Sequence, residues 1–115
     1  MSMLLKTRRL DDVVILDLSG RITIGEGTVM LRDTLQKLLA DGDRKFLVNL
    51  EAVDYIDSSG LGELVTGFTT VRHQGGHLKL LKLTRRVRDL LQITKLLTVF
   101  ESFDNETEAI KSLRY

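Results

Sequence analysis

The chain has 115 residues, the usual length of one domain, and a chain of this size buries roughly two-thirds of its extended surface on folding. Lys and Arg number 17 against 16 Asp and Glu, a formal charge of +1, and aromatic residues make up only 5%. This composition lacks both the basic excess and the stacking platform that favour nucleic acid. There is no cysteine, which excludes disulfides and thiolate chemistry. We therefore expect a single domain over residues 1–115 with no nucleic-acid partner.

The first residues predict a β-hairpin and no targeting segment. The stretch MSMLLKTRRLDD holds only two consecutive leucines before charge begins, too few for a signal peptide or a membrane span. Residues 3–8 alternate weakly between apolar and polar, and Asp11-Asp12 marks a turn before the apolar run VVILDL at 13–18. We expect the second strand to end at Gly20, and the protein to be cytoplasmic with no membrane partner.

A helix and a central strand follow the hairpin. After the glycine-containing loop RITIGEG, leucines recur at helical spacing and predict a helix over about 28–40, which Asp41-Gly42 ends. The run KFLVNL is short, apolar and bounded by charge, the pattern of a strand covered on both faces. It predicts a central strand over residues 46–50.

The second half of the chain continues the alternation of helices and strands. An apolar stripe predicts a helix from Ser58 to the glycine pair at 75–76. We then expect a strand at 77–83, a short helix around 87–91, a strand at 98–103, and a last helix that begins near Asn105. The order β-β-α-β-α-β-α-β-α predicts an α/β fold: a mixed, mostly parallel sheet of about five strands with about four helices.

The stretch DYIDSSGLG at residues 54–62 lies where the central strand meets the second helix, and it has three interpretations. In the first, Asp57 or Ser58 only caps the helix, by accepting a hydrogen bond from a backbone N–H. In the second, a serine is a nucleophile, but the G-x-S-x-G elbow is absent, since Ile56 and Asp57 stand where its first glycine would be. In the third, a separate kinase phosphorylates the serine.

The nucleophile interpretation also lacks a base. The only histidines are His73 and His77, and fifteen residues of helix put His73 about 22 Å from Ser58. Two histidines without matched carboxylates do not form a metal shell either, so no metal and no cofactor are expected.

The kinase interpretation gives several features of the stretch a purpose. A serine in the first turn of a helix is accessible, and its phosphate would meet unpaired N–H groups and the positive end of the helix dipole. Gly60 and Gly62 cost helix stability, and room for a partner's active site would offset that cost; loop permissiveness is the simpler explanation.

The segment NLEAVDYIDSSGLGELV resembles the STAS domain of bacterial anti-sigma factor antagonists, and the resemblance extends through LDLSGRI, HQGGHLKLLKL, RRVRDLLQITKLLTVF and FDNETEAIKSL. It implies a non-enzymatic protein, a monomer or weak homodimer, that binds an anti-sigma factor serine kinase and thereby releases a sigma factor. It further implies that the kinase phosphorylates Ser58, that Asp57, Ser59 and Gly60 surround the phosphosite, and that a PP2C-type phosphatase removes the phosphate.

The expected partner surface is the helix start and the outward side of the helix. Beyond the serines it includes the small or polar residues Gly62, Glu63, Thr66 and Thr69. Thr23 belongs to the same surface, but it stands where the family often has an acidic residue, so contacts there can differ. Lys95 replaces a common glycine and is expected to alter only a turn.

Other functions stay open at this stage. The same fold serves as a scaffold subunit of a larger stress-signalling assembly and as a small partner of a transporter. A small serine hydrolase is a further alternative, as is a domain that binds an anion or nucleotide between Gly25-Glu26-Gly27 and Ser58. Arg85, Arg86 and Arg88 are either a partner patch or an ordinary solvated helix face.

Overall fold

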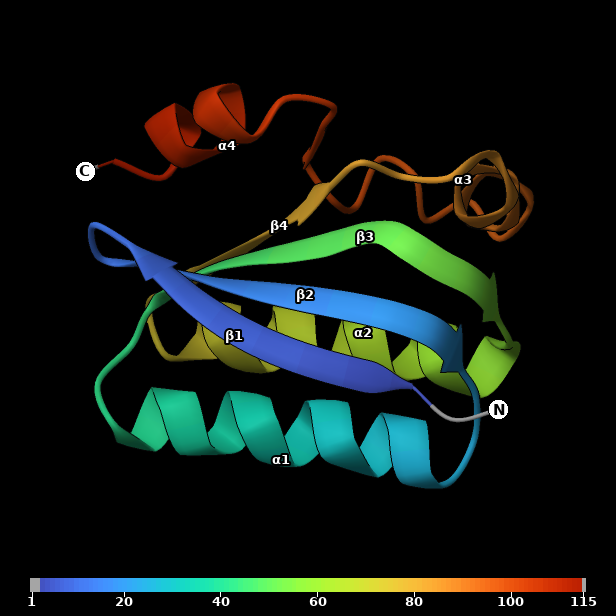
Figure 1. Cartoon of the computed structure of the whole chain (residues 1–115), viewed down its shortest axis with the longest axis horizontal. Coiled ribbons are helices and arrows are strands. Elements are labelled where there is room, and N and C mark those ends of the chain that lie inside the picture. The colour runs from blue at the N-terminus through green and yellow to red at the C-terminus, as the bar shows by residue number, and fades with distance from the viewer. Residues whose placement is uncertain (1–2, 115) are drawn as a thin grey trace.

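A computed structural model describes residues 3–114 and shows one five-stranded sheet between two layers of helices. Helices α1 and α2 cover one face, and α3 and α4 lie over the other (Figure 1). The elements, in chain order, are β1 (Leu4–Leu10), β2 (Val13–Ile22), α1 (Glu26–Ala40), β3 (Lys45–Ile56), α2 (Ser58–His73), β4 (His77–Leu81), α3 (Arg85–Ile93), β5 (Ser102–Phe103) and α4 (Glu106–Ser112).

The sheet is mixed, as predicted. Its strands follow chain order from β1 to β5; β1 runs antiparallel to β2, and every other neighbouring pair is parallel. Parallel neighbours need crossovers, which α1, α2 and α3 provide. The carboxyl ends of β2, β3 and β4 therefore lie at one edge of the sheet, and the predicted α/β fold and element order are confirmed.

Alternation along β2 divides the core into two layers. Val14 and Leu16 belong to the large apolar cluster that includes leucines of α1 and α2. Val13 and Ile15 point to the opposite face, into a smaller cluster that α4 closes with its apolar side chains. Because both faces are covered, β2 is an almost continuous apolar run.

The predicted ends of β2 and β3 are wrong. Strand β2 passes through Gly20, whose φ of 88° and the neighbouring register shift mark a bulge rather than an end. Strand β3 continues to Ile56 instead of stopping at Leu50. Its second half pairs only with β2, because β4 pairs with β3 no further than Asn49. The residues around buried Val53 are therefore exposed: Glu51, Ala52 and Asp54.

The predicted strand at 98–103 is wrong except for its last two residues. Residues 97–99 form a turn, and Phe100 is buried by edge-on packing against Phe68, with ring centroids 5.2 Å apart. The apolar pattern there serves a buried turn instead of a strand. Helix α1 also begins two residues earlier than expected, at Glu26, and β4 ends at Leu81 instead of residue 83.

Candidate functional site

The site lies at the carboxyl edge of the sheet, where β3 passes into α2. The backbone N–H of Asp57 donates to the Ile22 carbonyl at 3.2 Å. The Asp57 carboxylate then accepts two backbone hydrogen bonds, from Gly60 at 2.7 Å and from Ile24 at 3.2 Å. Asp57 is therefore the N-cap of α2, and it also ties the loop after β2 to the start of the helix.

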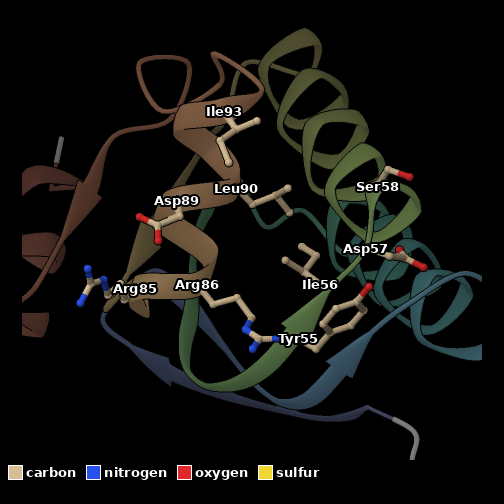
Figure 2. A pocket seen from close by; sticks show the side chains of 9 residues that line it. All are labelled: Tyr55, Ile56, Asp57, Ser58, Arg85, Arg86, Asp89, Leu90 and Ile93. Carbon is tan, nitrogen blue, oxygen red and sulfur yellow. The ribbon is translucent and has the colours of Figure 1, made fainter.

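This capping by Asp57 leaves the Ser58 hydroxyl unoccupied. Ser58 is the first residue of α2 and is exposed, and its hydroxyl forms no hydrogen bond with any residue in the range 3–114. Figure 2 shows the hydroxyl directed outward from the first turn, away from α3. Ser59, the next residue, is partly buried. Of the two adjacent hydroxyls, that of Ser58 is the more accessible to a second protein.

The two glycines of the motif have different roles. A side-chain carbon at Gly60 would overlap the backbone carbonyl of Ile22, so Gly60 permits α2 to start directly against β2. At Gly62 the same carbon would meet nothing within 4 Å. Close packing within the chain therefore accounts for Gly60, and only Gly62 leaves open space outside the helix.

Of the four residues predicted to face outward from α2, three are exposed and one is buried. Gly62, Thr66 and Thr69 are exposed. Glu63 is only 7% exposed and accepts a hydrogen bond from Arg32 of α1 at 2.8 Å. That hydrogen bond raises the pKa of the Arg32 guanidinium. Glu63 thus links the two helices and does not belong to a free surface.

The loop after β2, which contains Thr23, lies beside the start of α2, as expected. Thr23 is partly buried, and the next residue, Ile24, is 75% exposed while its N–H contacts Asp57. Gly25 has a φ of 104° and precedes α1 without a side-chain cap. Gly27 packs against β2, with the Arg21 carbonyl 3.5 Å from where its side chain would begin.

The histidines lie far from the serines. Ser58 and His73 are the first and last residues of α2, and His77 begins β4 at the opposite edge of the sheet. A Ser–His pair cannot form in this fold. Within the described part of the chain, no three His, Asp or Glu side chains are placed to hold a metal ion. Among residues 3–114, no helix is long and apolar enough to cross a bilayer.

A groove of about 770 Å³ adjoins Ser58, and sequence reasoning missed it. It lies between the end of β3, the start of α2, and α3 (Figure 2). Its lining comprises Tyr55, Ile56, Asp57, Ser58, Arg85, Arg86, Asp89, Leu90 and Ile93. Arg88, the third arginine noted in the sequence, is not among them and lies 4.0 Å from Asp104.

Comparison with known proteins identifies the family. The family model for the STAS domain matches residues 5–109, and the chain belongs to this family. The anti-sigma-B factor antagonist of Bacillus subtilis is 36% identical over 85 residues, which cover 74% of this chain and 76% of that protein.

Solved structures agree with this assignment. The crystal structure of an anti-sigma factor antagonist from Thermotoga maritima aligns with a TM-score of 0.88 at 26% identity, over 96% of this chain and 95% of that one. The Bacillus protein SpoIIAA in its unphosphorylated form gives a TM-score of 0.76 at 20% identity, over 96% and 98%. The latter likeness concerns the fold alone.

Proposed function

We propose that the protein is an anti-sigma factor antagonist: it binds an anti-sigma factor that is also a serine kinase, and so releases a sigma factor. Phosphorylation of Ser58 by that kinase ends the binding, and a PP2C-type phosphatase restores it. Such a protein would act in the cytoplasm, as a binding module without catalysis of its own.

The observation that carries the proposal is that Asp57 and Ser58 have different roles: Asp57 caps α2, and Ser58 does not. Asp57 supplies the cap that the helix needs, so the Ser58 hydroxyl has no structural task and is exposed. If capping were the only purpose of the motif, one polar residue would be enough. An exposed hydroxyl in the first turn of a helix suits a kinase substrate.

The same geometry explains how a phosphate would act as a switch. The phosphoryl group adds about −1.5 to −2 charges beside the Asp57 carboxylate, which already accepts hydrogen bonds from the backbone N–H groups of Gly60 and Ile24. A partner surface packed against a neutral hydroxyl would have to bury this charge. Unfavourable charge juxtaposition costs several kcal/mol, and about 4.1 kcal/mol is a thousandfold in affinity. No change of fold is needed.

The free edges of the sheet support a monomer or a weak homodimer. Within residues 3–114, no strand lies along the outer edge of β1, and β1 carries Lys6, Arg8 and Arg9. Basic side chains on an edge strand oppose pairing with a second copy of the same strand. The other edge strand, β5, has only two residues.

Phosphosite mapping tests the proposal. The purified protein is incubated with ATP and the purified kinase-fold anti-sigma factor encoded in the same genome, and the product is mapped by mass spectrometry. We expect phosphate on Ser58, none on a Ser58→Ala variant, and unchanged phosphorylation of a Ser59→Ala variant. If the two proteins bind but Ser58 stays unmodified throughout the incubation with ATP, the result would instead favour a second candidate, an unphosphorylated scaffold or transporter-associated STAS subunit.

A further inference from the structure

The groove beside Ser58 differs from the rest of the surface in its apolar side chains. Ile93, the last residue of α3, is 79% exposed, more than any other large apolar side chain in residues 3–114. The Ile93 side chain lines the groove next to half-buried Leu90, and buried Ile56 lies deeper between α3 and α2 (Figure 2). A scattered exposed isoleucine needs no explanation, but one at the rim of an apolar groove is characteristic of an interaction site.

Three arginines in or beside the groove form no ion pair with the described residues. No carboxylate within residues 3–114 lies within 4.0 Å of the guanidinium groups of Arg21, Arg85 or Arg86. Arg21 instead lies over the Tyr55 ring, 4.5 Å from its centroid, and Arg86 lies 5.8 Å from the same centroid. These contacts hold the two arginines beside the groove without neutralising them.

The acidic groups of the groove do not balance this charge. Asp57 lines the groove, but its carboxylate is engaged by two backbone N–H groups. Asp89 is exposed and is the remaining carboxylate of the lining. Arg21, Arg85 and Arg86 carry +3 in formal charge against −2 from Asp57 and Asp89, so the groove and its rim keep a net positive charge of +1.

We propose that this groove is a second part of the surface that recognises the kinase partner, and that it receives an acidic segment of the partner whose apolar side chain packs against Leu90 and Ile93. The inference rests on the proposed function, and it places recognition across α3 as well as along α2. Electrostatic complementarity with Arg21, Arg85 and Arg86 selects an acidic segment.

The position of Ser58 supports a protein occupant. Ser58 itself lines the groove, so a kinase that reaches its hydroxyl must also approach the groove. A stable interface covers roughly 800 Å² of each partner, a patch about 30 Å across. The chain measures 32 × 26 × 23 Å, so a patch of that size centred on Ser58 extends over α3. A second copy of this chain would present the same arginines, which repel one another.

Affinity measurements with two groove variants test the inference. The purified anti-sigma factor of the phosphosite experiment is titrated with the wild type, Arg86→Glu and Ile93→Ser. Both residues are exposed, so the fold should persist, which circular dichroism and thermal unfolding verify. Matched controls come from outside the groove: Lys111→Glu reverses an exposed charge on α4, and Leu10→Ser removes an exposed apolar side chain from the hairpin.

We expect Arg86→Glu to weaken binding at least tenfold and to reduce its salt dependence. Ile93→Ser should weaken binding about fivefold to tenfold, with both controls near the wild type.

If the wild type binds and both groove variants bind as tightly as the wild type, the inference is overturned while the proposed function stands. If the wild type itself does not bind, the proposed function fails. Altered self-association in sedimentation with unchanged partner affinity would assign the groove to a second copy of this chain and also overturn the inference.

Discussion

The two ends of the sheet treat their charges differently. At the hairpin end, Arg9 pairs with Asp43 at 2.6 Å and Lys45 with Asp12 at 2.8 Å, while Arg114 contacts Asp11. At the end that carries Ser58, Arg21 and Arg86 have no carboxylate within 4.0 Å among residues 3–114, and Ile24 and Ile93 are the most exposed large apolar side chains.

This difference supports the proposal that the end carrying Ser58 binds a partner. Exposed ion pairs add little stability individually, but they satisfy the charges of the hairpin end within the chain. The end that carries Ser58 keeps unpaired arginines and apolar groups around an exposed hydroxyl, a composition that suits binding better than stability. The carboxyl ends of parallel strands are also where ligands commonly bind in open α/β sheets.

The largest effect on stability is expected from Gly60→Ala, which tests whether the start of α2 packs tightly against β2 at the end that carries Ser58. The added methyl group would overlap the Ile22 carbonyl, and we expect a loss of about 3 kcal/mol in the free energy of unfolding, measured with urea. The matched variant Gly62→Ala faces open space inside the same helix and should be neutral or stabilising by up to about 1 kcal/mol. Equal effects of both substitutions would contradict the close packing at Gly60.

Asp57→Ala is expected to have the next largest effect, because it removes the cap of α2 and the link to Ile24 together. We expect the free energy of unfolding to fall by about 1–2 kcal/mol. Asp54→Ala is the control, since Asp54 is exposed and forms no hydrogen bond through its side chain within residues 3–114. The Ile24 and Gly60 amides should also exchange hydrogen faster in the Asp57 variant, and not in the control. Unchanged protection of both amides would contradict their hydrogen bonds to Asp57.

Lys95→Gly should stabilise the protein, by about 1 kcal/mol. Lys95 follows α3 with a φ of 62°, a left-handed conformation that is costly for a side chain and free for glycine. Lys95 was expected to alter only a turn, and the alteration is a strained backbone conformation at this one residue. The melting temperature should rise without a change in partner affinity; a lower melting temperature would mean that the lysine side chain itself contributes to folding.

The smallest effect concerns pH and the ion pairs that fasten α4 to the sheet. Hydrogen bonds from Arg8 hold the pKa of Glu106 below its usual range. Partial burial raises the pKa of Asp17, but hydrogen bonds from Arg8 and Asn49 outweigh it and lower the pKa. Both groups thus stabilise the fold above the unfolded-state pKa near 4, and that contribution is lost as pH falls through the lower folded values.

Comparison of unfolding at pH 7 and pH 3 measures this contribution. Because the groups are partly exposed, we expect about 1 kcal/mol or less in total. Arg8→Met should reduce the loss of stability between the two pH values, whereas Lys111→Met, which removes an exposed charge elsewhere on α4, should not. An unchanged acid dependence in Arg8→Met would show that other carboxylates dominate.

The element order and the position of Ser58 at the start of a helix could be predicted because their signals are local. Apolar periodicity marks the helices and strands, and Asp57-Ser58 stands directly between a strand and a helix in the sequence. The end of β3 was missed because its exposed residues reflect the absence of a neighbouring β4, which no local pattern reveals.

The surface around the site could not be predicted for the same reason. Glu63 is polar and was assigned to the outward side, but it pairs with Arg32, 31 residues earlier in the chain. The groove joins Tyr55 to Arg86 and Ile93, which lie far apart in sequence and meet only because α3 packs over the end of β3. Such convergence depends on the packing of elements and not on their local pattern.

The most direct test of the central claim compares the affinity of unmodified and Ser58-phosphorylated protein for the purified anti-sigma factor, by isothermal titration calorimetry with an ATP analogue that cannot donate phosphate. If the charge of the phosphate blocks the interface, the Kd of the phosphorylated form should be about a thousandfold higher, while both forms should have the same circular dichroism spectrum. Equal affinities of the two forms would contradict the claim that phosphate on Ser58 switches the protein off.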